Sequence, residues 1–281
     1  MPDIPCCIAR RGRYALHRAA ASLINLRDRW RDPAAARFFQ ALVAEGFDPE
    51  AHIDVLPQQR LIYLCVPKSA STTIKAALAA IAGRTVPPHR LHARRHSGLS
   101  SPRHVGISTF HHLATNPRTL RFSFVRNPYA RLVSAWADKY RGKPLVAGDA
   151  FVDQYLAYRR ADGRPPVRGS DETLSFADFV AFACATADAR LNAHWAVQDD
   201  MVTMPGIALD FIGKVETFGR DFARVIDHID PRRQSGLALA PHHNISAHAA
   251  WQRYYDDALA ARVHRAYERD FDRFGYVRAI G

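Results

Sequence analysis

The stretch LIYLCVPKSASTTIK, residues Leu61 to Lys75, decides the fold, because it has the pattern of a buried strand, a short loop and the start of a helix. Its first six residues form an almost unbroken apolar run, which is typical of a strand covered on both faces in a mainly parallel sheet. Pro67 ends that run. Apolar residues then recur at helical spacing from Ile74 onward, and Gly83 predicts where the helix ends.

The loop between this strand and this helix is rich in groups that bind anions. It brings one ammonium group and several hydroxyl groups to a helix start, where backbone N–H groups and the positive end of the helix dipole favour phosphate or sulfate. It is not the loop G-x-x-x-x-G-K-[ST] of nucleotide triphosphatases, because it has no glycine and its lysine precedes the hydroxyls. A hydroxyl-rich helix start that binds no ligand also fits the pattern. The candidate anion-binding residues are Pro67, Lys68, Ser69, Ala70, Ser71, Thr72 and Thr73.

The positive charge of the chain is concentrated around this loop. The formal net charge is +12, and no Asp or Glu occurs between Val55 and Ala137. This acid-free segment holds twelve of the 39 lysines and arginines, and the other 27 basic residues equal the 27 acidic ones in number. An excess placed around a candidate anion loop favours a bound polyanion, and a solvated basic face is the alternative.

Length and composition indicate a folded α/β protein. We expect residues 51–281 to form one domain and residues 1–50 to form a helical extension packed on it, with one helix over 13–30. No apolar run is long enough to span a membrane and no secretory signal is evident, so the predicted location is the cytoplasm. The four cysteines form no disulfide or CxxC pattern, and His89, His92 and His96 lack a nearby carboxylate or thiol, so we predict no metal site.

A second strand, loop and helix follow at Arg121 to Tyr140, RFSFVRNPYARLVSAWADKY. Arg126 follows the strand, Asn127 is a candidate N-cap, and a proline fits the first helical turn. Ligands of open parallel sheets bind outside the carboxyl ends of the strands, so we expect Lys68 and Arg126 to face one crevice. Ser134 lies about two helical turns further on and would contact another edge of the ligand. The two units therefore predict two phosphate-type contacts on one ligand.

Two adjacent histidines are candidates for a general base. His111 and His112 follow a short strand that we predict over Val105 to Thr109, in a His- and Arg-rich loop between the two units. A histidine in this position can accept a proton near neutral pH, although a partly buried structural histidine is the more common outcome. Elsewhere, the patterns predict helices over 33–43, 151–158, 176–182, 220–229 and 246–271, and a strand over 210–215.

Taken together, the two units resemble the sulfotransferase family, and in particular its carbohydrate-type, family 2-like branch. The 5′-phosphosulfate loop of that family has the form P-K-x-x-[ST]-T, and its 3′-phosphate motif has the form R-[DN]-P-x-x-R-L-V-S-x-[YW]. The matching residues are Pro67, Lys68, Ser71 and Thr72 in the first motif, and Arg126, Asn127, Pro128, Arg131, Leu132, Val133, Ser134 and Trp136 in the second. The similarity continues with HWxxQ at His194 to Gln198, DFIGKVET at Asp210 to Thr217, and Y-x-x-D-F-x-x-F-G-Y at Tyr267 to Tyr276. The chain departs from many cytosolic members in having Ala70 where they have glycine, and in lacking their C-terminal R-K-G-x-x-G element.

The resemblance implies a P-loop-like, three-layer α/β fold whose central, mainly parallel sheet is flanked by helices. It also implies metal-independent transfer of the sulfuryl group of 3′-phosphoadenosine 5′-phosphosulfate (PAPS) to an acceptor hydroxyl of a carbohydrate or glycoconjugate. In that reaction Lys68 would stabilise the leaving phosphate, the loop 67–73 would hold the 5′-phosphate, and Arg126 and Ser134 would hold the 3′-phosphate. Thr217 would lie near the adenine, and His112 or His111 would act as the base. Lipids and small hydroxyl compounds are further possible acceptors.

Two other functions compete with this interpretation. A P-loop kinase or nucleotide triphosphatase normally holds Mg²⁺ with a carboxylate near a strand end, and the acid-free segment offers none. A nucleic-acid-binding protein could use the basic segment, although the aromatic residues of 246–271 have the spacing of a packing stripe. The sequence favours the sulfotransferase over both.

Overall fold

The computed structural model describes residues 30–44, 48–91, 97–165, 167, 171–188, 191–231 and 250–279. The helix predicted over 13–30 lies outside these residues except for Trp30, and His92 and His96 also lie outside them. Within the part of the chain that is described, none of the helices has both the length and the apolar character that crossing a bilayer demands.

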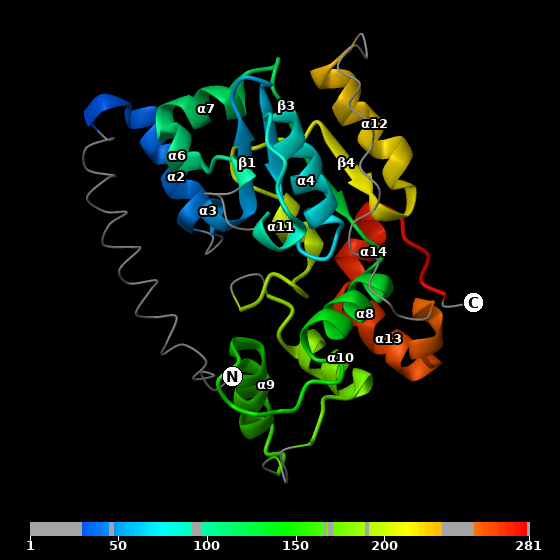
Figure 1. The fold of residues 1–281 in the computed structure, drawn as a ribbon. Coiled ribbons are helices and arrows are strands. Elements are labelled where there is room, and N and C mark those ends of the chain that lie inside the picture. The colour runs from blue at the N-terminus through cyan, green and yellow to red at the C-terminus, as the bar shows by residue number, and fades with distance from the viewer. Residues whose placement is uncertain are drawn as a thin grey trace.

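A four-stranded sheet forms the centre of the molecule (Figure 1). Its strands lie in the order β1 (Ile53–Leu56), β2 (Leu61–Leu64), β3 (Leu120–Val125) and β4 (Phe211–Lys214). β1 pairs antiparallel with β2, whereas β2, β3 and β4 run parallel to one another. The mainly parallel sheet predicted from the sequence is thus confirmed, and β1 adds an antiparallel edge strand that the sequence did not reveal.

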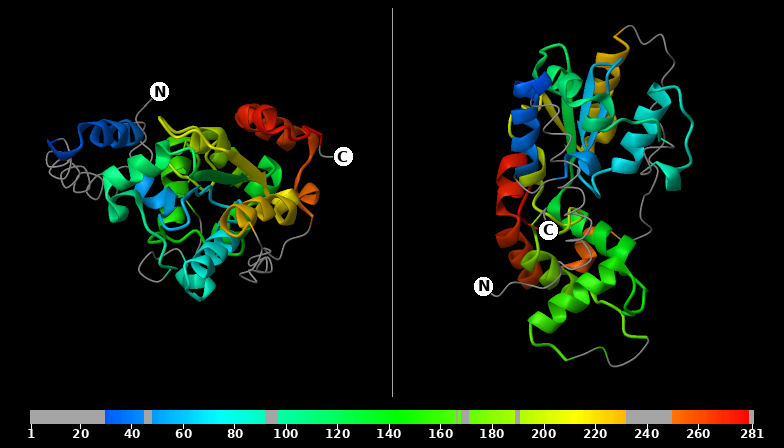
Figure 2. Two further views of the ribbon diagram at one scale, coloured as in Figure 1. Left: turned by 90° about the horizontal axis from the view of Figure 1, so that it is seen from above. Right: turned by 90° about the vertical axis from the view of Figure 1, so that its left-hand side faces the viewer.

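Helices cover both faces of the sheet, so the fold has three layers (Figure 2). Leu61 and Tyr63 of β2 pack against α4 (Ser71–Ile81) and α12 (Phe218–Ile229). The alternate residues Ile62 and Leu64 pack on the other side, in a cluster with α2 (Pro33–Ala44) and α7 (Ile107–Thr115). Every residue of β2 is buried, as expected of a strand with helices on both faces.

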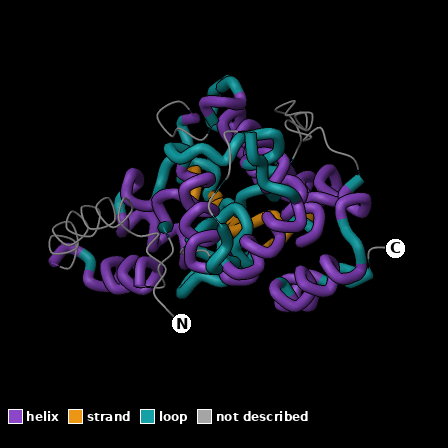
Figure 3. The backbone as a smooth tube through the Cα atoms, turned by 90° about the horizontal axis from the view of Figure 1, so that it is seen from below, coloured by secondary structure: helices purple, strands orange, loops and turns teal. Residues whose placement is uncertain are grey.

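A group of helices forms a second core at the end of the sheet where β2 and β3 finish (Figure 1). This core surrounds Trp195, which is fully buried. Viewed from below, the strands lie in the centre with helices around them (Figure 3). The helices of the second core are α8 (Pro128–Lys139), α9 (Ala150–Ala161), α10 (Phe176–Ala185), α13 (Asp257–Ala266) and α14 (Glu268–Phe274).

The predicted helices over 33–43, 151–158, 176–182 and 220–229 and the strand over 210–215 are confirmed, with no end displaced by more than three residues. The strand predicted over Val105 to Thr109 is wrong, because α6 (Pro102–Val105) and α7 occupy that region. Ile107, Phe110 and Leu113 are buried, at a spacing of three that a helix provides and a strand does not. The helix predicted over 246–271 is divided, since Asp256 caps a new helix, α13, and residues 246–249 lie outside the described part of the chain. The remaining short helices are α3 (Pro49–His52), η1 (Pro88–Arg90), α11 (Gln198–Val202), η2 (Val215–Thr217) and η3 (Trp251–Tyr254).

Candidate functional site

The loop between β2 and α4 contains two residues in the left-handed region of backbone space. Lys68 has a φ of +67° and Ala70 a φ of +59°, values that cost free energy for any residue other than glycine. Such strain is often found at functional sites. α4 begins at Ser71, and Ala70 at the N-cap position provides no side-chain acceptor for the first turn. The N-terminal end of α4 therefore lies beside Lys68 without a side-chain cap, which suits a bound anion.

The Lys68 ammonium group belongs to an ion cluster at the end of α8. Nζ of Lys68 lies 3.2 Å from Oδ2 of Asp138, and the same oxygen lies 2.9 Å from Nζ of Lys139. Burial lowers the pKa of Lys68, and the Asp138 carboxylate opposes that effect. Burial raises the pKa of Asp138, but the attraction of Lys68 and Lys139 outweighs it and lowers the pKa to about 2. Asp138 therefore favours the charged form of Lys68 against the effect of burial.

The two carboxylates that border the acid-free segment both pair with a lysine of the first unit. Asp138 is the first acidic residue after that segment and Asp54 is the last one before it. Oδ2 of Asp54 in β1 lies 3.1 Å from Nζ of Lys75 in α4, and both side chains are buried. The positive charge of this segment is thus partly balanced within the fold. Asp138, the partner of Lys68, is more exposed than Asp54, the partner of Lys75.

Arg126 meets the first loop directly. It follows β3, and its Nη1 atom donates a hydrogen bond to the backbone oxygen of Lys68 at 3.4 Å. Burial lowers the pKa of Arg126, and the carboxylate of Glu216 opposes that effect. Asn127 accepts hydrogen bonds from the backbone N–H groups of Tyr129 and Ala130, as a helix N-cap does. The structure therefore brings the two predicted anion sites together at one edge of the sheet.

The buried side chain of Gln198 joins the two loops. Its Oε1 atom accepts from the hydroxyl of Ser69 at 3.2 Å and from the backbone N–H of Arg126 at 2.9 Å. Its Nε2 atom donates to the backbone oxygen of Arg126 at 2.8 Å. Because Gln198 has no exposed surface, these bonds are protected from water. Gln198 was recognised in the sequence only as the last residue of HWxxQ.

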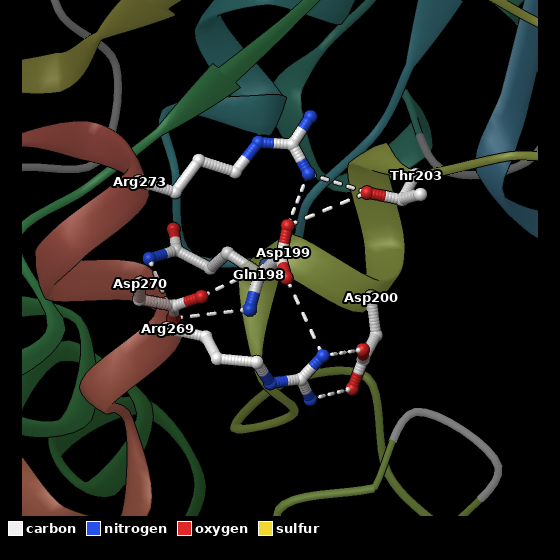
Figure 4. A network of polar contacts seen from close by, with 7 residues as sticks. All are labelled: Gln198, Asp199, Asp200, Thr203, Arg269, Asp270 and Arg273. Carbon is white, nitrogen blue, oxygen red and sulfur yellow. Dashed lines mark hydrogen bonds and ion pairs between the residues drawn. The ribbon is translucent and has the colours of Figure 1, made fainter.

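Asp270 on α14 holds Gln198 in place (Figure 4). Its carboxylate accepts from the backbone N–H of Gln198 at 3.0 Å, from its Nε2 atom at 3.2 Å, and from the backbone N–H of Asp199 at 2.8 Å. Burial raises the pKa of Asp270, and these donors oppose that effect. Nearer the surface, Asp199 pairs with Arg269 and Arg273. The C-terminal motif is therefore part of the framework that supports the site.

Arg131 is a second buried connection between the parts of the site. Its Nε atom donates to the backbone oxygen of Pro67 at 3.0 Å. Its two terminal nitrogens donate to the backbone oxygens of Ala196 at 2.5 Å and Ala193 at 2.8 Å. The guanidinium group thus ties α8 to the first loop and to the segment before α11. The sequence motif contains Arg131, but no sequence pattern shows that its partners are backbone carbonyls.

The structure does not bring His111 and His112 to Lys68. Both lie on α7, where the His111 ring packs 5.0 Å from that of Phe38 and His112 is exposed beside Asn116. The last turns of α7 contact the start of β3, since Arg121 donates to the backbone oxygen of Ala114. Lys68 and Arg126 lie at the opposite end of the sheet, a strand length of about 17 Å away. The predicted base role depended on a strand over 105–109 that would end at these histidines. The structure has α6 and α7 there instead, so the histidines lie on a helix.

The remaining predicted residues, Ser134 and Thr217, lie in α8 and directly before α12. Ser134 is buried in α8. The hydroxyl of Thr217 donates to Oδ2 of Asp221 at 2.6 Å, so it stabilises the first turn of α12. Glu216 accepts from the backbone N–H of Asn127 at 2.8 Å and thus joins the end of β4 to the start of α8. The roles assigned to Ser134 and Thr217 stay predictions.

Comparisons with known proteins agree with this arrangement. Carbohydrate sulfotransferase 11 of Danio rerio is 26% identical over 239 residues, which cover 80% of this chain and 67% of the relative. Carbohydrate sulfotransferase 12 of Mus musculus is 25% identical over 260 residues, 81% of this chain and 60% of the relative. Carbohydrate sulfotransferase 14 of Homo sapiens is 25% identical over 209 residues, 72% of this chain and 50% of the relative.

The chain thus spans between half and two thirds of the length of these relatives. No solved structure gives a significant match. The sequence profile of the sulfotransferase family matches residues 51–277, which include both loops, Gln198 and Asp270. This chain therefore belongs to the sulfotransferase family.

Proposed function

We propose that this protein transfers the sulfuryl group of PAPS to a hydroxyl group of a carbohydrate. The observation that carries the proposal is the pairing of the Lys68 loop with Arg126 through the buried amide of Gln198. Such a pair of sites suits a ligand with an anionic group at each end. The names of the relatives support a carbohydrate as the acceptor.

In this proposal the first loop binds the 5′ end of PAPS. The N-terminal end of α4 and the hydroxyls of Ser71, Thr72 and Thr73 hold the 5′-phosphate. Lys68 exchanges Asp138 for the oxygen that links the phosphate to the sulfuryl group. Its ammonium then stabilises the negative charge that builds on this oxygen as the bond to sulfur breaks. Arg126 and Ser134 bind the 3′-phosphate, and Thr217 contacts the nucleoside.

Two measurements test this proposal. Isothermal titration should show that the desulfated product, 3′-phosphoadenosine 5′-phosphate (PAP), binds more tightly than ATP with Mg²⁺. Transfer from radiolabelled PAPS is then measured over desulfated glycosaminoglycans, neutral polysaccharides, lipids and simple alcohols. Transfer to a glycan is the expected result, and transfer only to lipids or alcohols would contradict the carbohydrate acceptor. Preferential binding of ATP with Mg²⁺ would refute PAPS as the donor.

Lys68→Ala should lower the turnover number by about 100-fold or more, which is typical for loss of one group that stabilises transition-state charge. The thermal unfolding curve of this variant should stay close to that of the wild type. Lys143→Ala is a matched control, because Lys143 is exposed and its Nζ atom donates to the backbone oxygen of Asp138 and not to its carboxylate. Equal losses in the two variants would show that general charge, and not the position of Lys68, governs the activity.

The competing functions fit the structure less well. A kinase needs a carboxylate for Mg²⁺ near the loop, but Asp138 is occupied by two lysines and Asp54 is buried with Lys75. A nucleic-acid-binding surface needs free cations, whereas Lys68, Lys75, Arg121 and Arg131 all bind groups within the protein. Salt-dependent binding to long duplex DNA that survives Lys68→Ala would favour the nucleic-acid function instead.

A further inference from the structure

His194 lies beside the ion cluster of Lys68, Asp138 and Lys139. Its ring packs edge-on against Phe151, with the ring centroids 5.1 Å apart. The ammonium group of Lys139 lies 4.6 Å from the centre of the same Phe151 ring. Lys139 and Lys68 share the carboxylate of Asp138. A continuous series of contacts therefore joins His194 to the lysine that is proposed to stabilise the leaving group.

Hydrogen bonds determine which nitrogen of His194 carries the proton. Nε2 of Gln154 donates to the backbone oxygen of Leu191, so Oε1 of Gln154 accepts from Nδ2 of Asn192 at 2.7 Å. Oδ1 of Asn192 must then be the atom that accepts from the backbone N–H of His194 at 3.0 Å and faces its Nδ1 atom at 2.9 Å. Nδ1 is therefore protonated, and in the neutral ring Nε2 carries the lone pair.

Nε2 of His194 is available to a bound molecule. Among the described residues Nε2 forms no hydrogen bond. It is also not one of the polar atoms that are fully buried without a partner, so it is accessible from outside the protein. Burial, followed by the positive charges of Lys139, Lys68 and Arg131, lowers the pKa of His194 to about 3, while Asp138 opposes these charges. The ring is thus neutral at physiological pH. When a polyanion neutralises Lys68, part of this effect disappears and the imidazole becomes a stronger base.

We infer that His194 is the general base of the transfer, with Nε2 as the atom that receives the proton of the acceptor hydroxyl. This inference rests on the proposed function. In the step, the acceptor oxygen forms a bond to sulfur while the bond from sulfur to the bridging oxygen breaks. The proton of the hydroxyl moves to Nε2, and the electron pair of the broken bond stays on the phosphate oxygen next to Lys68. Asn192 is a positioning residue, because its Oδ1 atom fixes the ring and its tautomer.

Other candidates for the base are less suitable. The carboxylate of Asp138 is close to Lys68, but two lysine ammonium groups already share its Oδ2 atom, so it is a poor acceptor for a further proton. His112 lies on α7 at the opposite end of the sheet. A purely structural role for His194, as a brace between Phe151 and Asn192, is the main alternative and is what the experiments must exclude.

The first experiment compares His194→Ala with the wild type, using PAPS and the acceptor found in the screen. The turnover number should fall by about 100-fold or more, because general bases typically contribute this much. The affinity for PAP, measured by titration, should stay within about twofold. Added imidazole should restore part of the turnover. A rise in the acceptor KM at unchanged turnover, or no rescue by imidazole, would indicate a binding or bracing role and overturn the inference.

Two further histidine variants serve as comparisons for His194→Ala. His228 contacts the backbone oxygen of Arg60, before β2 and therefore at the far end of the sheet, so His228→Ala should leave turnover unchanged. His112→Ala tests the base predicted from the sequence, and loss of turnover there with activity retained in His194→Ala would overturn the inference. If the wild type binds no PAP, the proposed function fails. If the wild type is active and His194→Ala is equally active, only the role of His194 fails.

The second experiment needs no acceptor and no variant. Nitrogen NMR of the wild-type protein should show His194 protonated on Nδ1 only, and its pKa near 3 should rise when PAP is added. The charged groups that act on this ring are Lys68 from the first loop and Arg131, Asp138 and Lys139 from α8. Bound PAP is expected to neutralise the positive charge of Lys68. An Nε2-protonated ring, or a pKa that PAP leaves unchanged, would contradict the inference even if His194→Ala did not fold.

Discussion

The side-chain amide of Gln198 makes both backbone hydrogen bonds of Arg126, accepting from its N–H at 2.9 Å and donating to its C=O at 2.8 Å. This is the pattern with which a neighbouring strand would satisfy a peptide group. The pairing extends order past the end of β3 to the residue proposed to bind the 3′-phosphate. Because the same amide oxygen accepts from Ser69, the position of Arg126 depends on the conformation of the first loop.

Gln198→Ala should therefore affect both stability and nucleotide binding. The change leaves the backbone groups of Arg126 and the hydroxyl of Ser69 without their partner, and each buried group without a partner costs about 1–3 kcal/mol. We expect the free energy of unfolding to fall by about 3 kcal/mol and the affinity for PAP to fall about tenfold. Urea denaturation and titration measure the two effects. Gln252→Ala is the control, because Gln252 is exposed.

Gln198→Glu tests the orientation of the amide. A carboxylate keeps the size of the side chain but turns the donor to Arg126 and Asp270 into an acceptor. The loss of stability at pH 7 should be at least as large as for alanine, and it should decrease as the pH falls, because a protonated glutamic acid can donate. Stability equal to the wild type at pH 7 would show that the hydrogen bonds donated by Nε2 do not contribute to stability.

Arg126→Ala and Ser134→Ala should reduce the contribution of the 3′-phosphate to binding. The useful quantity is the ratio of the affinities for PAP and for AMP, which lacks that phosphate. Loss of a hydrogen bond to a charged group costs about 1.5–3 kcal/mol, so for Arg126→Ala the ratio should fall about 10- to 100-fold. Lys68→Ala should leave the ratio close to that of the wild type, since Lys68 acts at the 5′ end. If Arg126→Ala lowers the affinity for PAP and for AMP by the same factor, Arg126 does not contact the 3′-phosphate.

The parts of the fold that the sequence predicted have a clear local pattern. β2 and β3 are short apolar runs, each followed by a proline and then by helical spacing, and the structure contains both units. The region 105–109 was predicted incorrectly: its β-branched residues Val105, Ile107 and Thr109 favour a strand locally. Packing against α2 decides in favour of a helix there, since it buries Ile107 and Phe110 on one side. This tertiary contact has no counterpart in the local sequence.

Charge and motif in the sequence predicted that Lys68 and Arg126 lie together, and the structure brings these two residues into contact. The residues that hold these two in place were not predictable. Gln198 and Arg131 act through backbone atoms of loops that are distant in the sequence, and Asp270 acts through Gln198. Their types and positions are visible in the sequence motifs, but a bond from a side chain to a backbone carbonyl leaves no periodic signal. The position of His194 beside Lys68 likewise depends on how α8 and α9 pack.

The ion cluster of Asp138 should make stability depend on pH in the acidic range. The pKa of Asp138 is about 2 in the folded protein, below the ordinary value of 3.8 expected after unfolding. Its contribution is therefore complete above about pH 5 and is lost as the pH falls toward 2. Because the side chain is 44% exposed, we expect about 1 kcal/mol after allowing for solvent screening. Urea denaturation of the wild type and Asp138→Asn measures it: the difference between them should shrink from pH 6 to pH 2.5, and a constant difference would contradict this role.

Ala70→Gly should stabilise the protein, although glycine usually has the opposite effect. The φ of Ala70 is +59°, a conformation that costs a residue with a Cβ atom about 1–2 kcal/mol and costs glycine little. Part of the gain is offset because glycine has more freedom in the unfolded chain, so we expect a net increase of about 1 kcal/mol in the free energy of unfolding. Ala80→Gly is the matched control, since Ala80 is exposed within α4 and should lose about 1 kcal/mol. If both variants lose stability, Ala70 does not adopt the left-handed conformation in solution. A gain in Ala70→Gly alone would show that the loop beside Lys68 stores backbone strain, and would explain why many cytosolic members of the family have glycine at this position.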